Sequence, residues 1–114
     1  MTRLCPLPFA QCEILAFVAE HNSPTMREIA KHFNITAPSA TSLVEGLVRH
    51  KMLTRAQDAQ DRRAVRLVLT AAGKRTATTL AKRKATVLGG IINKLNDDDR
   101  RDLERILRRI TSTL

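Results

Sequence analysis

The chain has 114 residues, enough for one domain with a core of its own but too few for a second domain. Hydrophobic residues make up 43% and aromatic residues 3%, with no Trp or Tyr, which suits an aliphatic helical fold and disfavours stacking platforms for single-stranded nucleic acid. The net charge of +9 is expected of a protein that binds nucleic acid.

The positive charge is concentrated in the middle of the chain. Residues 58–96 contain nine basic and two acidic residues. The segment before them contains six basic and four acidic residues, and the segment after them contains five of each. No apolar run approaches the roughly 20 residues that span a bilayer, and the N-terminus lacks a signal-peptide pattern. We therefore expect a cytoplasmic protein that does not associate with membranes.

Two cysteines, Cys5 and Cys12, lie near the N-terminus without a metal-ligand spacing. This pattern indicates neither a zinc site nor a disulfide framework, so we interpret both as buried or incidental thiols. The three histidines are dispersed, and no catalytic triad or Gly-rich phosphate loop is present. We expect no enzyme activity, no metal and no cofactor.

The first two predicted helices have clear ends. Apolar residues recur with helical spacing from Phe9 to His21, which predicts one helix. Thr25 and Glu28 form a T-x-x-E capping box, which predicts the start of the next helix. Asn34 falls where the following turn must adopt a left-handed conformation, and Asn tolerates that conformation best after Gly.

A third helix should begin after Thr36, its expected N-cap, with Pro38 in the first turn, where a missing amide hydrogen does no harm. The apolar stripe of this helix consists of Ala40, Leu43, Val44 and Leu47. Its other faces carry Ser39, Thr41, Ser42, Glu45, Gly46 and Arg49. Small polar residues near the helix start allow close approach to DNA bases and phosphates. Two short helices joined by a tight turn are typical of a helix-turn-helix.

A β-hairpin follows, with predicted strands Leu53–Arg55 and Val65–Leu69 and a charged turn between them. Beside a helix-turn-helix, such a hairpin is a wing. The Asp61 carboxylate could hold one guanidinium while Arg62 or Arg63 reaches a narrow minor groove, where negative potential is enhanced. The alternative is a surface ion pair contributing about 0 to 1 kcal/mol.

The C-terminal part should form two helices. Thr70 can cap a long helix that ends in the low 90s, and Asn96 followed by three carboxylates predicts the start of the last helix. The last helix has an apolar stripe of Leu103, Ile106, Leu107, Ile110 and Leu114. We expect this stripe to pack on the long helix, on a second subunit in a homodimer, or on both.

These elements predict a mainly α fold with a small β-hairpin wing in a single domain. Residues 7–70 would form the winged helix-turn-helix, which binds DNA, and residues 71–114 a C-terminal helical dimerisation region.

The segment Asp61–Thr70, the segment Thr36–Thr41 and the later Gly73 together resemble the MarR family of winged-helix transcription regulators. The resemblance extends from Leu7 to the C-terminus, and the wing pattern of D-x-R, a strand ending in Leu-Thr and a Gly-containing helix start is its most specific part. It implies a homodimer on a palindromic double-stranded DNA site, with recognition helices in major grooves and wings in minor grooves. It also implies a small-molecule effector.

By position, the resemblance implies recognition-helix contacts and a wing arginine, Arg63, steadied by Asp61. The predicted DNA-binding residues are Thr36, Pro38, Ser39, Thr41, Ser42, Arg49, Arg62 and Arg63. Three departures from the family pattern stand out. The chain begins close to the family's second helix, so most of the usual first dimerisation helix is missing. Lys51 occupies a position that is usually Gly, where it must adopt a left-handed conformation or redirect the chain. The cysteines do not align with the reactive cysteine of the oxidation-sensing branch.

Two functions remain open at this point. The first is a sequence-specific, double-stranded-DNA-binding transcription regulator, more often a repressor. The second is a winged-helix interaction module or antirepressor that does not itself read DNA.

Overall fold

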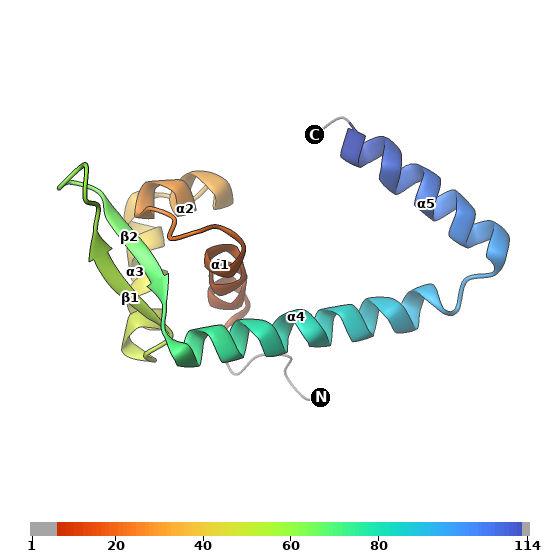
Figure 1. Cartoon of the computed structure of the whole chain (residues 1–114), viewed down its shortest axis with the longest axis horizontal. Coiled ribbons are helices and arrows are strands. Elements are labelled where there is room, and N and C mark those ends of the chain that lie inside the picture. Colours follow the sequence, from red (N-terminus) through yellow and green to blue (C-terminus); the bar gives the residue numbers. More distant parts are fainter. Residues whose placement is uncertain (1–6, 113–114) are drawn as a thin grey trace. The chain divides into compact units, whose positions relative to one another are not determined.

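The structure, a computed structural model, describes residues 7–112. The helices are α1 (Phe9–Glu20), α2 (Met26–Phe33), α3 (Ala37–Arg49), α4 (Ala71–Ile92) and α5 (Asp97–Ser112), and the strands are β1 (Leu53–Gln57) and β2 (Val65–Leu69) (Figure 1). The predicted fold class, mainly helical with one hairpin, is confirmed. The chain divides into two compact units, one up to residue 81 and one from residue 82 onwards, so the boundary falls within α4.

The predicted helix caps are present. The Thr25 hydroxyl accepts a hydrogen bond from the Glu28 amide at 3.1 Å, and the Asn96 side chain accepts one from the Asp99 amide at 2.8 Å. Such caps satisfy backbone amides that a helix start leaves without partners, and each contributes about 1 kcal/mol. The sequence therefore determines where α2 and α5 begin.

Thr70 caps α4 and also fixes it to the preceding chain. Its hydroxyl oxygen accepts from the Gly73 amide at 2.9 Å, and the hydroxyl donates to the Lys51 carbonyl at 2.6 Å. Gly73 lies so close to the backbone that a Cβ there would be 2.0 Å from the Met52 carbonyl oxygen. The first turn of α4 is therefore packed directly on the segment between α3 and β1.

Among residues 7–112, three residues other than Gly adopt left-handed backbone conformations, and each lies at a junction of the first unit. Asn34 has φ 52° between α2 and α3, as predicted. Lys51 has φ 58° between α3 and β1, so it accepts the left-handed strain instead of redirecting the chain. Ser23, with φ 50° between α1 and α2, was not predicted, because Asn22 beside it is the residue that tolerates this conformation better, yet Ser23 adopts it.

The hairpin is antiparallel, with Leu53 opposite Leu69 and Gln57 opposite Val65, so β1 runs two residues beyond its predicted end. The other edge of β2 is also occupied. The Leu67 amide donates to the Pro24 carbonyl at 2.9 Å, next to an isolated bridge between residues 25 and 66. The wing is therefore attached to the turn between α1 and α2.

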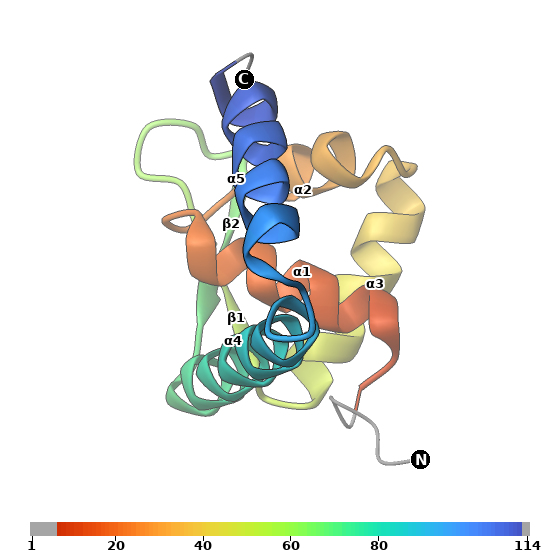
Figure 2. The same ribbon diagram turned by 90° about the vertical axis from the view of Figure 1, so that its right-hand side faces the viewer.

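The core of the first unit is aliphatic. Helix α1 lies between α3 and the strands and packs against α3 and β2 (Figure 2). Helix α3 also packs against α2 and against β1. The largest fully buried side chains are Ile14, Leu15, Ile29, Val44, Leu47, Leu53 and Leu67, together with Pro24. Burial of each aliphatic side chain of this size contributes about 1.5–3 kcal/mol. The predicted stripe of α3 is confirmed as part of its buried face, with Leu43 half-buried. Gly46, which was expected on another face of the helix, is buried as well.

The second unit has no comparable core among its described residues. No residue of α5 is buried, and large apolar side chains on the last turns of α4 and on α5 are about half exposed. These are Val87, Leu88, Ile91, Ile106 and Leu107.

The prediction of unpaired thiols is wrong for Cys12. This residue is buried on α1 and takes part in a disulfide bond; Cys5 lies outside the described residues. A disulfide depends on how closely two sulfur atoms approach in three dimensions, which sequence spacing does not reveal. Among residues 7–112, no helix is long and apolar enough to cross a membrane.

Candidate nucleic-acid interface

The start of α3 carries a pair of linked hydroxyl groups. The Thr36 hydroxyl oxygen accepts from the Ser39 amide at 3.2 Å, and the Thr36 hydroxyl donates to Ser39 Oγ at 2.9 Å. Both side chains are exposed, as is Pro38 between them. The positive end of the helix dipole and short polar side chains therefore lie together at the surface, an arrangement suited to a phosphate or a base edge.

The exposed face of α3 continues along the helix. Ser42, Glu45 and Arg49 are exposed at intervals of three or four residues, and Thr41 is half-buried beside them. Glu45 forms an ion pair of 3.5 Å with Arg55 on β1. This pair is not among the predicted site residues, because it depends on the packing of α3 against β1, which sequence spacing does not reveal. Both partners are exposed, so the pair contributes at most about 1 kcal/mol to stability.

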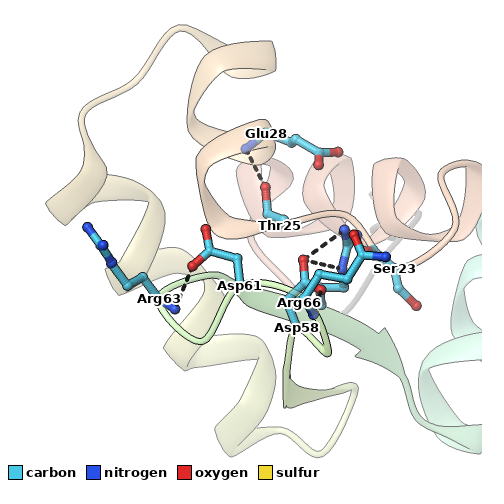
Figure 3. A network of polar contacts seen from close by, with 8 residues as sticks. Ser23, Thr25, Glu28, Asp58, Asp61, Arg63 and Arg66 are labelled. Carbon is cyan, nitrogen blue, oxygen red and sulfur yellow. Dashed lines mark hydrogen bonds and ion pairs between the residues drawn. The ribbon is translucent and has the colours of Figure 1, made fainter.

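The turn of the wing is shaped by bonds between side chains and backbone (Figure 3). Asp61 Oδ1 accepts from the Arg63 backbone amide at 3.0 Å, and the Asp61 carbonyl accepts from the Ala64 amide at 3.0 Å. Gln57 Nε2 donates to the Arg62 carbonyl at 3.1 Å. Asp61 therefore folds the turn through the Arg63 backbone, where the sequence analysis had expected an ion pair with a guanidinium.

Both arginines of the turn are exposed. Within residues 7–112, neither the Arg62 nor the Arg63 guanidinium takes part in an ion pair. Their charges are consequently available to an external anion, which is what a wing that contacts DNA requires.

At the base of the wing, Asp58 and Arg66 form an ion pair that the sequence analysis missed. Arg66 Nη2 lies 3.1 Å from Asp58 Oδ2, and Arg66 Nη1 donates to the Ser23 carbonyl at 2.8 Å (Figure 3). A hydrogen bond from the Gln60 amide, together with the Arg66 charge, holds the pKa of Asp58 below its ordinary value against partial desolvation. Asp58 is therefore ionised at neutral pH.

An open groove of about 1000 Å³ separates the wing from the helix-turn-helix. Its helix side comprises Thr25, Met26, Arg27, Glu28, Ala30 and Ala37, and its wing side comprises Asp58, Asp61, Arg63, Ala64 and Val65. The groove thus lies between the start of α3 and the wing arginine.

The structure therefore brings several predicted site residues into one region. Thr36, Pro38 and Ser39 lie at the start of α3, close to the groove that Arg63 lines, with Arg62 in the same turn. Arg49 lies at the opposite end of α3. Within residues 7–112, no three His, Cys, Asp or Glu side chains cluster as metal ligands would.

Comparison with known proteins agrees with this arrangement. An uncharacterised HTH-type transcriptional regulator of Bacillus subtilis, YwhA, is 21% identical over 97 residues, which cover 85% of this chain and 70% of that protein. Among solved structures, Streptococcus pneumoniae FabT in complex with DNA has a TM-score of 0.84 at 18% identity, covering 95% of this chain and 76% of FabT. MepR, a transcription regulator of the Staphylococcus aureus multidrug efflux pump MepA, has a TM-score of 0.78 at 22% identity, covering 95% of this chain and 80% of MepR.

The structural likenesses agree on a winged-helix fold, and a match of the sequence itself is more specific. Residues 6–64, which include the helix-turn-helix and the turn of the wing, match the sequence profile described as MarR family. The chain belongs to the MarR family of winged-helix transcription regulators.

Proposed function

We propose that this protein is a sequence-specific, double-stranded-DNA-binding transcription regulator. The observation that carries the proposal is the position of the start of α3, with its exposed hydroxyls, beside a groove lined by the wing residue Arg63. A helix start can enter a major groove while the wing turn reaches the neighbouring minor groove. FabT, of the same fold, was solved in complex with DNA.

The proposed assembly is a homodimer on a palindromic site. The half-exposed apolar side chains of the second unit support it, because such side chains on neighbouring helices are typical of an interface. We further propose repression by occlusion of a promoter, relieved by a small-molecule effector. These two features rest on family membership.

Selection from a random duplex pool, followed by a salt titration of the recovered site, tests the proposal. We expect a site with two-fold symmetry and an affinity that falls steeply as salt rises, since each phosphate contact contributes a slope of about −0.9. Salt-independent binding that requires a protein partner would instead support an interaction module or antirepressor.

Arg63→Ala should weaken binding to the selected duplex and reduce the salt slope by about one unit per subunit, because one phosphate-facing charge is lost. Arg75→Ala is a matched control, since Arg75 is also exposed in the first unit but lies on α4. Fluorescence anisotropy at several salt concentrations measures both quantities. Equal losses in the two variants would mean that Arg63 acts only through net charge.

Ser39→Ala should alter preference among related duplexes more than affinity for random DNA, because it removes a hydroxyl at the exposed start of α3. The Ser39 amide still donates to Thr36, so the helix cap is retained. Competition binding with single-base variants of the selected site measures the preference. If the affinities for the selected site and for random DNA fell equally, Ser39 would be a phosphate contact and not a base contact.

A further inference from the structure

The wing contains two kinds of charged residue that differ in their contacts. Arg62 and Arg63 are exposed in the turn, whereas Arg66 is bound on two sides at the base. Its Nε and Nη2 lie 3.2 and 3.1 Å from one carboxylate oxygen of Asp58, and its Nη1 donates to the Ser23 carbonyl. The guanidinium is therefore already engaged before any DNA phosphate arrives.

Asp58 and Arg66 together connect segments that are far apart in the sequence. Asp58 immediately follows β1, and its amide donates to the Ala64 carbonyl at the other end of the turn. Ser23 lies in the turn between α1 and α2, at a left-handed backbone position. One guanidinium thus connects the wing turn and β2 to the turn between α1 and α2.

The burial of the pair favours a fixed geometry. The Asp58 side chain is 16% exposed and that of Arg66 is 37% exposed, so water screens this pair less than the exposed pair of Glu45 and Arg55. Asp58 also accepts from the Gln60 amide at 3.0 Å, which fixes its carboxylate to the turn. Asp58 and Arg66 both belong to the wing, so rotation of the wing away from α2 would break the bond of Arg66 to the Ser23 carbonyl. Asp58 moves with the wing and holds the guanidinium in the orientation that makes this bond.

We propose that Asp58 and Arg66 are positioning residues, which clamp the wing to the turn between α1 and α2 and thereby aim Arg62 and Arg63 at the DNA. This inference rests on the proposed function. It assigns Arg66 a role different from that of a phosphate contact, although all three arginines lie in the same wing.

The direction in which Asp58→Asn changes DNA affinity distinguishes a positioning role from a purely electrostatic effect. Asp58→Asn removes a negative charge from a face that binds a polyanion, so without a positioning role it should leave DNA affinity unchanged or raise it. If the clamp operates, the same substitution should lower affinity, by roughly tenfold for a charged hydrogen-bond pair. Asn can still accept from the Gln60 amide, so the turn itself is retained.

The experiment compares Asp58→Asn, Arg66→Gln and the double variant on the selected duplex. We expect each single variant to lose affinity and the double variant to lose no more than the weaker-binding single one, because both break the same clamp. Hydroxyl-radical footprints should lose protection in the flanking minor grooves and retain it at the centre of each half-site. Additive losses, or an Asp58→Asn variant that binds as well as the parent protein, would overturn the proposal.

Two exposed residues of the first unit serve as matched controls: Glu20→Gln removes one negative charge and Arg75→Gln removes one positive charge. A second readout needs no DNA. Hydrogen exchange at the amides of the wing turn should be faster in Asp58→Asn than in Glu20→Gln. If the parent protein binds no duplex, the proposed function fails; unchanged exchange in Asp58→Asn would by itself overturn the clamp.

Discussion

Gly73→Ala is expected to lower the free energy of unfolding by about 3 kcal/mol, a large part of the stability of an ordinary domain. The added Cβ would lie 2.0 Å from the Met52 carbonyl oxygen, whereas real contacts of this kind are essentially never shorter than 3.0 Å. The neighbour is backbone, so it cannot rotate away. The first turn of α4 must shift, which strains both bonds of the Thr70 hydroxyl.

Helix propensity alone predicts the opposite sign, because Ala in a helix interior is favoured over Gly by about 1 kcal/mol. Gly89→Ala on the same helix isolates that term, since a Cβ there would meet no atom of the described residues within 4 Å. We expect Gly89→Ala to raise the unfolding free energy by about 0.5–1 kcal/mol. Urea denaturation followed by circular dichroism measures both variants, and a stabilised Gly73→Ala would contradict the close packing.

Leu88→Asp and Ile91→Asp are each expected to weaken the proposed homodimer at least about a hundredfold, because a desolvated carboxylate without a partner costs several kcal/mol at an interface. The two side chains are 58% and 55% exposed in the single chain, so the substitutions should leave its fold intact. Affinity for a two-fold duplex should fall with dimerisation, since each protomer then binds one half-site alone. Analytical ultracentrifugation and gel shift measure the two effects.

Thr86→Asp supplies the control. Thr86 is exposed on the same helix, two residues from Leu88 and on a different side, and the substitution adds the same charge. Circular dichroism spectra of all three variants should match the parent spectrum. If Thr86→Asp dissociates the dimer equally, net charge and not the apolar face controls assembly; if none of the three does, the interface lies elsewhere.

Much of the first unit was predictable because its signals are local. Thr25, Thr36 and Thr70 mark helix starts through their own side chains, and the apolar spacing of α3 identifies its buried face. These features depend on neighbours within four residues, which sequence spacing reports directly.

The wing was only partly predictable because its contacts are not local. Proximity in sequence suggests an ion pair between Asp61 and an arginine side chain, yet Asp61 accepts from the Arg63 backbone amide. Arg66 instead reaches Asp58 across the hairpin and Ser23 across 43 positions. Such partners become visible only when strand register and the turn between α1 and α2 are both known. The disulfide of Cys12 was missed because sequence spacing does not reveal how closely two sulfur atoms approach.

The left-handed residues at three junctions of the first unit also affect the rate at which it would bind DNA. Glycine at these joints would leave many backbone conformations open, whereas Ser23, Asn34 and Lys51 restrict the unfolded chain and hold single turns. We expect a unit with such restricted turns to dock on the duplex as a rigid body, with little ordering of its loops on binding. Its association rate should therefore be governed by attraction between its positive charge and the duplex, and should slow with added salt.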